Sequence, residues 1–325
     1  MWARRRRTNS LQPHFLVFLA LFALVPLAAG AQITWDAQSG TQQWGDAVNW
    51  DPNTVPTSTD DVIIPTTPAF FNIFPDLSAV SPTDASVRSL TIQGGASVTL
   101  GGRTLNVYGD LANSGAIDAS TAGSTMALRG GVNQNVDTGG SALGDLVINK
   151  TGGTATATAD ITLNDDLIRT AGNFDMGANA LTIADDIQYT AGSFTSTGTV
   201  TLTTGTNAAV DVTNATLANL TVNKVGGIAT VGSAITLSGN LARTAGDISL
   251  AANALTVGGN ISHTAGALTS TGTVTLDGGG AQAVDFTNST LTNLTVNKGG
   301  GTATAGSTID LSGTLTRTAG ALAMG

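Results

Sequence analysis

Adjacent aspartates are the residues of this sequence whose type and spacing could do chemistry. They form three pairs, Asp60-Asp61, Asp165-Asp166 and Asp185-Asp186. Paired carboxylates on one face could act as the acid and base of a polysaccharide-cleaving enzyme, or as hard oxygen ligands of calcium. In the next repeat, Gly239-Asn240 and Gly259-Asn260 stand in place of the last two pairs. Because Asp, Gly and Asn all suit tight turns, we predict turn residues here, and too few ligands for a metal site.

The other catalytic constellations are missing from the sequence. His263 is the one histidine after residue 31, and the equivalent place in the preceding repeat holds Tyr189. The chain has no cysteine and no glutamate, which excludes thiol nucleophiles, thiolate metal sites and glutamate-based acid/base pairs. We therefore predict no catalytic, cofactor-binding or metal-ligating residue, and no enzymatic activity.

Internal repetition is the strongest feature of the sequence. The three lysines of the chain, Lys150, Lys224 and Lys298, follow one another at intervals of 74 residues. An Arg-Thr-Ala-Gly block keeps the same interval, beginning at positions 169, 243 and 317. We predict that these lysines and arginines are exposed structural positions and not a row of ligand-binding groups.

A shorter period within each unit predicts the fold. The apolar-x-apolar triplets of the first unit begin at Leu146, Ile161, Leu181, Val200 and Leu220. A short segment with one apolar strand and several turn residues cannot bury its own apolar face, but stacked segments can. We therefore predict an all-β fold, a right-handed parallel β-helix (β-solenoid) with about four coils in each 74-residue unit. The alternative is a tandem array of β-sandwiches of 74 residues each.

The first thirty-one residues have the order of a secretory signal peptide. A basic stretch at Arg4–Arg7 precedes an apolar stretch at Phe15–Leu27, and Ala29-Gly30-Ala31 forms a small-residue cleavage site. We predict cleavage between Ala31 and Gln32 and a secreted chain with no membrane span. The removed segment holds four arginines and no acidic residue, so the net charge changes from −9 to −13. Such an acidic chain repels phosphate backbones, which argues against nucleic-acid binding.

Residues 32–88 differ from the repeats that follow in residues 89–325. This segment holds Trp35, Trp44 and Trp50, whereas large aromatic residues are rare in the repeats. We predict an aromatic-rich N-terminal cap that covers the open end of the solenoid, because an uncovered end exposes apolar side chains and unpaired strand edges. The alternative is that the three indole rings form a stacking platform for sugar rings.

The segments Thr34-Trp35-Asp36, Gln43–Trp50 and Asp60–Pro65 resemble the opening of large bacterial secreted β-strand-repeat proteins. The repeats resemble those of autotransporter passengers and filamentous-haemagglutinin-like adhesins. The resemblance implies a parallel β-helix at the cell surface, with a role in adhesion or in a matrix. The sequence departs from these families because it shows no C-terminal translocator barrel or other anchor, and Gly325 lies within a repeat. We therefore expect that the chain is truncated.

These observations together predict a non-catalytic structural or adhesive repeat protein of a bacterial cell surface or extracellular matrix. Its expected partners are surface components of a host or matrix, including polysaccharide. One alternative is a β-helical carbohydrate-active enzyme, which a cluster of exposed carboxylates on one face would favour. The other is a carbohydrate-binding module, which exposed and coplanar indole rings would favour.

Overall fold

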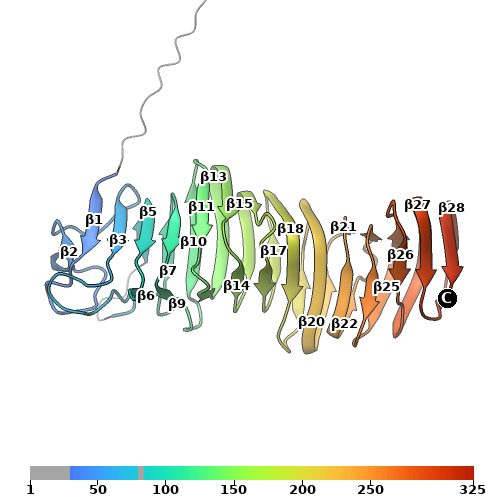
Figure 1. The fold of residues 1–325 in the computed structure, drawn as a ribbon. Helices are drawn as coiled ribbons and strands as arrows, with labels where there is room; N and C mark the ends of the chain where they lie inside the picture. The colour runs from blue at the N-terminus through green and yellow to red at the C-terminus, as the bar shows by residue number, and fades with distance from the viewer. Residues whose placement is uncertain (1–29, 80–83) are drawn as a thin grey trace, which may run out of the picture.

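The structure, a computed structural model, describes residues 30–79 and 84–325. Most of the predicted signal peptide, residues 1–29, lies outside the described residues. Short strands joined by turns wind around one axis, and about 12 coils stack into an elongated molecule (Figure 1). One short 3₁₀-helix interrupts the strands and turns of the described residues.

The strands alternate with turns along the whole described chain. The first part contains β1 (Gln32–Trp35), the 3₁₀-helix η1 (Ala47–Asn49), β2 (Trp50–Asp51), β3 (Asp61–Ile64), β4 (Ala85–Val87), β5 (Ser89–Ile92), β6 (Ser97–Thr99), β7 (Thr104–Val107), β8 (Leu111–Asn113), β9 (Ala116–Asp118), β10 (Thr125–Gly130), β11 (Gln134–Asp137), β12 (Ala142–Leu143), β13 (Asp145–Ala157) and β14 (Ile161–Leu163). The second part contains β15 (Leu167–Asp175), β16 (Leu181–Ile183), β17 (Ile187–Tyr189), β18 (Ser193–Leu202), β19 (Ala208–Val210), β20 (Ala215–Val231), β21 (Ile235–Leu237), β22 (Leu241–Ser249), β23 (Leu255–Val257), β24 (Ile261–His263), β25 (Leu268–Leu276), β26 (Gln282–Val284), β27 (Ser289–Ala305) and β28 (Leu315–Met324).

Strand pairing confirms the predicted parallel β-solenoid. Within the described part of the chain, one strand pair, β1 with β2, is antiparallel, and every other pair of named strands is parallel. The pairing continues through the boundaries of the 74-residue units, for example from β18 to β20 and from β25 to β27. A tandem array of separate β-sandwiches is therefore excluded.

The apolar triplets form the core, as their alternation predicts. In β14 and β16, the outer two residues of each triplet are buried and the middle threonine points away from the core. One continuous hydrophobic cluster extends from Ile33 to Ala305. Each fully buried aliphatic side chain stabilises the fold by about 1.5–3 kcal/mol, so the stack gains stability with every coil.

The 74-residue unit corresponds to slightly less than four coils. Along one face, three successive coils connect Leu146, Leu167, Ile187 and Val210. Beyond Val210 the chain passes the face that holds Ala215 and Leu217, and the equivalent triplet of the next unit begins at Leu220 on the face after that. The unit therefore comprises three coils and two additional faces, slightly less than the four coils expected from the sequence.

The same step recurs in the following unit. Leu220 pairs with Leu241, and two more coils lead through Ile261 to Val284. Leu294, the equivalent of Leu220, then lies on the third face, where it pairs with Val274. Equivalent positions of successive units therefore lie on different faces of the rod.

The N-terminal cap is continuous with the stack. Strand β1 pairs in parallel with β3, and β3 with β5, so the parallel ladder begins before the predicted boundary at residue 88. The predicted cleavage point lies where this ladder starts: the Ala31 carbonyl accepts a hydrogen bond from the Asp61 backbone at 2.8 Å, and Gln32 opens β1. No helix among the described residues is long and apolar enough to cross a membrane.

Candidate functional sites

The three tryptophans of the cap are core residues. Trp35 and Trp50 are 0% exposed and Trp44 is 1% exposed. Their rings meet edge to face, with centroids 4.9 Å apart for Trp35 and Trp50 and 4.8 Å apart for Trp44 and Trp50. The indole nitrogens of Trp35 and Trp50 donate to the backbone carbonyls of Ile73 and Trp44, each at 2.8 Å. Because protein covers these rings, they offer no face to a sugar, and the stacking platform considered for them is corrected to a packed cap.

The repeated lysines are buried, contrary to the prediction of exposed positions. Lys150, Lys224 and Lys298 are 2%, 0% and 2% exposed. The Nζ of Lys150 donates to the Gln134 side chain at 3.1 Å and to a backbone carbonyl, and Lys298 does the same with Gln282 at 3.0 Å. Burial lowers the pKa of all three amines, because the charged form loses its hydration.

Lys224, the second of the three lysines, donates its hydrogen bonds to backbone carbonyls alone. Ala208 occupies the place that Gln134 and Gln282 hold in the other copies. Lys224 Nζ instead donates to the carbonyls of Ala184 at 3.1 Å and Thr203 at 2.8 Å. Buried polar groups must find partners, and the inward-facing carbonyls at the corners of the coils supply them.

The arginine side chains of the first two Arg-Thr-Ala-Gly blocks also lie inside the solenoid. Arg169 and Arg243 are 1% and 0% exposed. Arg169 Nη2 donates to the carbonyls of Asp211 at 2.9 Å and Thr213 at 3.1 Å, and Arg243 makes the equivalent pair of bonds in the next unit at the same distances. Each arginine thus ties its own strand to a segment more than 40 residues further along the chain. These two arginines are structural, as predicted, but internal, whereas Arg317 in the last coil is exposed.

Five aspartates gather at one corner of the first unit, a set that we call the aspartate ladder: Asp145, Asp165, Asp166, Asp185 and Asp186. Carboxylate oxygens of Asp145, Asp165 and Asp166 lie within 4.8 Å of one another. Asp145, Asp166 and Asp186 each accept a bond from the backbone N–H of the following coil, at 3.2, 2.8 and 2.7 Å. The turn role predicted for the aspartate pairs is thus confirmed here, and stacking also brings the pairs together across coils.

The negative charges of the aspartate ladder repel one another. Burial raises the pKa of Asp166 to about 6, and the carboxylates of Asp186, Asp165 and Asp145 add to the effect. The pKa of Asp165 is raised as well, through burial first and then through its charged neighbours. Carboxylates packed this closely hold protons more tightly because each charge disfavours the next.

The aspartate ladder could attract a hard cation, but the oxygens of its central residue, Asp166, are already engaged. Both Asp166 oxygens accept hydrogen bonds, one from the Asp186 backbone at 2.8 Å and one from Gln188 at 2.7 Å. Calcium takes six to eight oxygen ligands, and the three clustered carboxylates supply fewer. His263 is far along the chain from this set, and its Nε2 contacts the Gly266 carbonyl at 3.0 Å.

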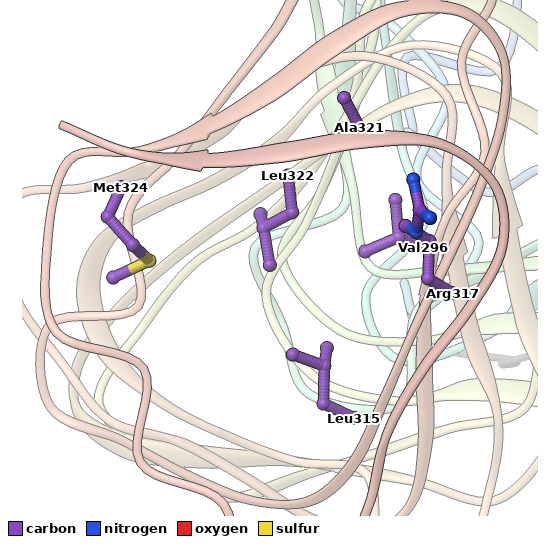
Figure 2. A pocket seen from close by; sticks show the side chains of 6 residues that line it. All are labelled: Val296, Leu315, Arg317, Ala321, Leu322 and Met324. Atoms are coloured by element: carbon purple, nitrogen blue, oxygen red, sulfur yellow. The ribbon is translucent and has the colours of Figure 1, made fainter.

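At the C-terminal end, the last coil leaves part of the core uncovered. A hollow of about 520 Å³ lies at this end. Figure 2 shows the side chains of Leu315, Leu322 and Met324 that line it. Leu315 and Met324 are 56% and 62% exposed. Their equivalents in the preceding unit, Leu241 and Leu250, are both 0% exposed beneath the following coil. The hollow is therefore the open cross-section of the solenoid core.

Sequence reasoning missed the buried cations and the clustering of the aspartates. A signal for the first was present, because the lysines and arginines are kept at a fixed interval while surface positions around them vary. No such signal marked the second, because the carboxylates meet only through stacking. The chain matches no protein-family model, no curated protein and no solved structure.

Proposed function

We propose that the chain is a non-catalytic structural or adhesive element of a bacterial cell surface or extracellular matrix. The uninterrupted parallel ladder from β1 to β28 carries this proposal, because it makes one rigid rod of repeated coils. With about 12 coils at a spacing of about 4.8 Å, the rod is roughly 60 Å long. A rod with buried cations and a polar, acidic exterior suits a spacer that holds binding groups away from a surface.

The predicted secretory signal supports an extracellular role. The predicted cleavage point at Ala31 and Gln32 lies at the start of the folded rod, so removal of residues 1–31 leaves β1 intact. The partners proposed for the rod are surface or matrix components, including polysaccharide. Lipid bilayers and nucleic acids are not among them, because the chain without residues 1–31 has a net charge of −13.

The test is to express the full chain with a C-terminal tag in a bacterial host that exports proteins. We expect the tagged chain outside the cytoplasm with Gln32 as its first residue, by fractionation and N-terminal mass spectrometry. Small-angle scattering of the purified protein should show an elongated particle. A chain that stays in the cytoplasm with Met1 retained would overturn the proposal, whatever its shape.

The aspartate ladder favours a second candidate, a β-helical carbohydrate-active enzyme. A carboxyl group with a pKa near 6, such as that of Asp166, can donate a proton close to neutral pH. The discriminating assay measures release of reducing ends from neutral and acidic polysaccharides by the unaltered chain and by Asp166→Asn. Turnover that disappears in the variant would replace the structural proposal with the enzymatic one.

A further inference from the structure

Two phenylalanines of the cap remain exposed although its tryptophans are buried. Phe70 and Phe71 are 56% and 52% exposed, whereas Trp35 is 0% exposed. The remainder of the cap could bury aromatic rings, so exposed rings at two adjacent positions need a separate explanation. Large exposed apolar groups with polar surroundings are typical of binding surfaces.

Phe70 borders a cleft of about 500 Å³, which we call the cap cleft. The cleft lies where the ends of β1 and β2 meet the loop that carries Phe70. Its volume is in the range of ligand-binding clefts, which combine apolar walls with a few placed polar groups. The apolar lining includes Phe70 and Pro52, and the polar lining consists of Asp36, Gln38, Asp51 and Asn53.

The walls of the cap cleft are held in place by hydrogen bonds to the cap core. The Phe70 backbone N–H donates to the Asp36 carbonyl at 3.0 Å, and three residues later the Ile73 carbonyl accepts the Trp35 indole N–H at 2.8 Å. The Asp36 side chain is itself 6% exposed, and its Oδ1 accepts a bond from the Gln38 backbone at 3.0 Å. The site is therefore built before any ligand arrives, which lowers the entropic cost of binding.

The chemistry of this lining identifies a class of ligand. The exposed ring of Phe70 offers an apolar face, and the carboxylates and amides around it accept or donate hydrogen bonds. A pyranose ring has the matching surfaces, with C–H groups on one face and hydroxyls around its edge. Both charged groups of the lining, Asp36 and Asp51, are acidic, so an anionic sugar would be repelled.

We propose that the cap cleft binds a neutral saccharide, with Phe70 as the stacking ring and Asp36 and Asp51 as acceptors for sugar hydroxyls. The inference names a ligand class for the adhesive role and in that respect rests on the function proposed above. It differs from the tryptophan platform because the ring in question is exposed and lies beside the polar side chains that line the cap cleft. Whether the purified chain binds sugar is independent of whether cells export it, so the two proposals fail separately.

The experiment is a calorimetric titration of the chain from Gln32 onward with neutral hexasaccharides of glucose, xylose, mannose and N-acetylglucosamine. Hexagalacturonate serves as the acidic comparison. We expect binding of at least one neutral probe, and about tenfold weaker binding to Phe70→Ala. Phe71→Ala is the matched control, because Phe71 is equally exposed but does not line the cap cleft.

The possible results of the titration either support the proposal or overturn it. A neutral probe that binds with a loss specific to Phe70→Ala, together with no measurable binding of hexagalacturonate, supports the proposal. It is overturned if no neutral probe binds, if Phe71→Ala loses as much affinity as Phe70→Ala, or if hexagalacturonate binds as tightly. Equal thermal unfolding of both variants and the unaltered chain shows that a loss is local. Asp51→Asn, at an exposed position, provides a second variant that should weaken binding without altering the fold.

Discussion

The first 74-residue unit, 145–218, and the second, 219–292, have the same hydrogen bonds at one corner, but the acceptors are charged in the first unit and neutral in the second. In the first unit the acceptors are the carboxylates of Asp145, Asp166 and Asp186. In the second unit the equivalent acceptors are side-chain amide oxygens, with donor–acceptor distances of 3.0, 2.7 and 2.9 Å. These amides belong to Asn219, Asn240 and Asn260.

The comparison shows that the corner requires a side-chain oxygen and not a charge. An amide oxygen satisfies the backbone N–H of the next coil as well as a carboxylate does. The aspartate ladder therefore adds electrostatic repulsion without adding a bond. Its charge is either a tolerated cost or the basis of an interaction at the surface of the first unit.

The largest expected difference between the units lies in their cores. Phe174 and Phe194 stack in the first unit with ring centroids 5.6 Å apart, and Ile248 and Leu268 occupy these places in the second. Phe194→Ala should lower the free energy of unfolding by about 3–5 kcal/mol, because it leaves a cavity beneath Arg169. Urea denaturation followed by circular dichroism measures the loss.

The graft Phe194→Leu sharpens this test, because it places the second unit's residue in the first. We expect it to cost less than half as much as Phe194→Ala, since leucine refills part of the space. If leucine proved as costly as alanine, the two cores would not be interchangeable, and the ring stack itself would be the essential feature.

The next effect concerns charge and depends on pH. The folded pKa of Asp166, about 6, lies above the ordinary aspartate value of 3.8. Protonated Asp166 thus stabilises the fold fully below the unfolded pKa, and this contribution is lost as the pH rises through about 6. Asp166→Asn should raise the free energy of unfolding by about 1 kcal/mol at about pH 7.5 and change it little at about pH 4.

The reciprocal variant Asn240→Asp supplies the control. Gly239, Asn219 and Asn260 carry no charge and Asn240 is exposed, so a carboxylate at position 240 meets neither a row of like charges nor the partial burial of Asp166. Its destabilisation near neutral pH should be smaller than the gain from Asp166→Asn. Equal effects would contradict the explanation of the Asp166 effect by burial and like charges.

The smallest effect concerns the buried lysines. Gln282→Ala should cost about 1 kcal/mol, because Lys298 would lose one acceptor yet could turn to backbone carbonyls as Lys224 does. Ala208→Gln should cause no loss in the second unit. A cost well above that of one hydrogen bond for Gln282→Ala would show that the glutamine positions the lysine. Thermal unfolding of the paired variants makes the measurement.

The sequence predicts the parallel stack because its apolar triplets recur and their middle residue is usually threonine. It does not show the number of coils directly, because the step from Leu146 to Ile161 leads two faces further along the same coil and not to the next coil. The prediction that the lysines are exposed was wrong for a physical reason. Burial of a cation is costly unless carbonyls surround it, and the carbonyls that surround these lysines come together only when the chain coils. The aspartate ladder arises across coils and has no counterpart within a single strand.

The step of three coils plus two faces has a consequence for how such a chain can lengthen. A duplicated unit of 74 residues begins and ends at a boundary between faces, so the strands on either side of the insertion still meet a partner of the same kind. Each duplication extends the rod by roughly 18 Å and rotates everything beyond it by about two thirds of a turn. A gene that gained units in this way would display its cap in three directions in succession, without any change to the cap itself.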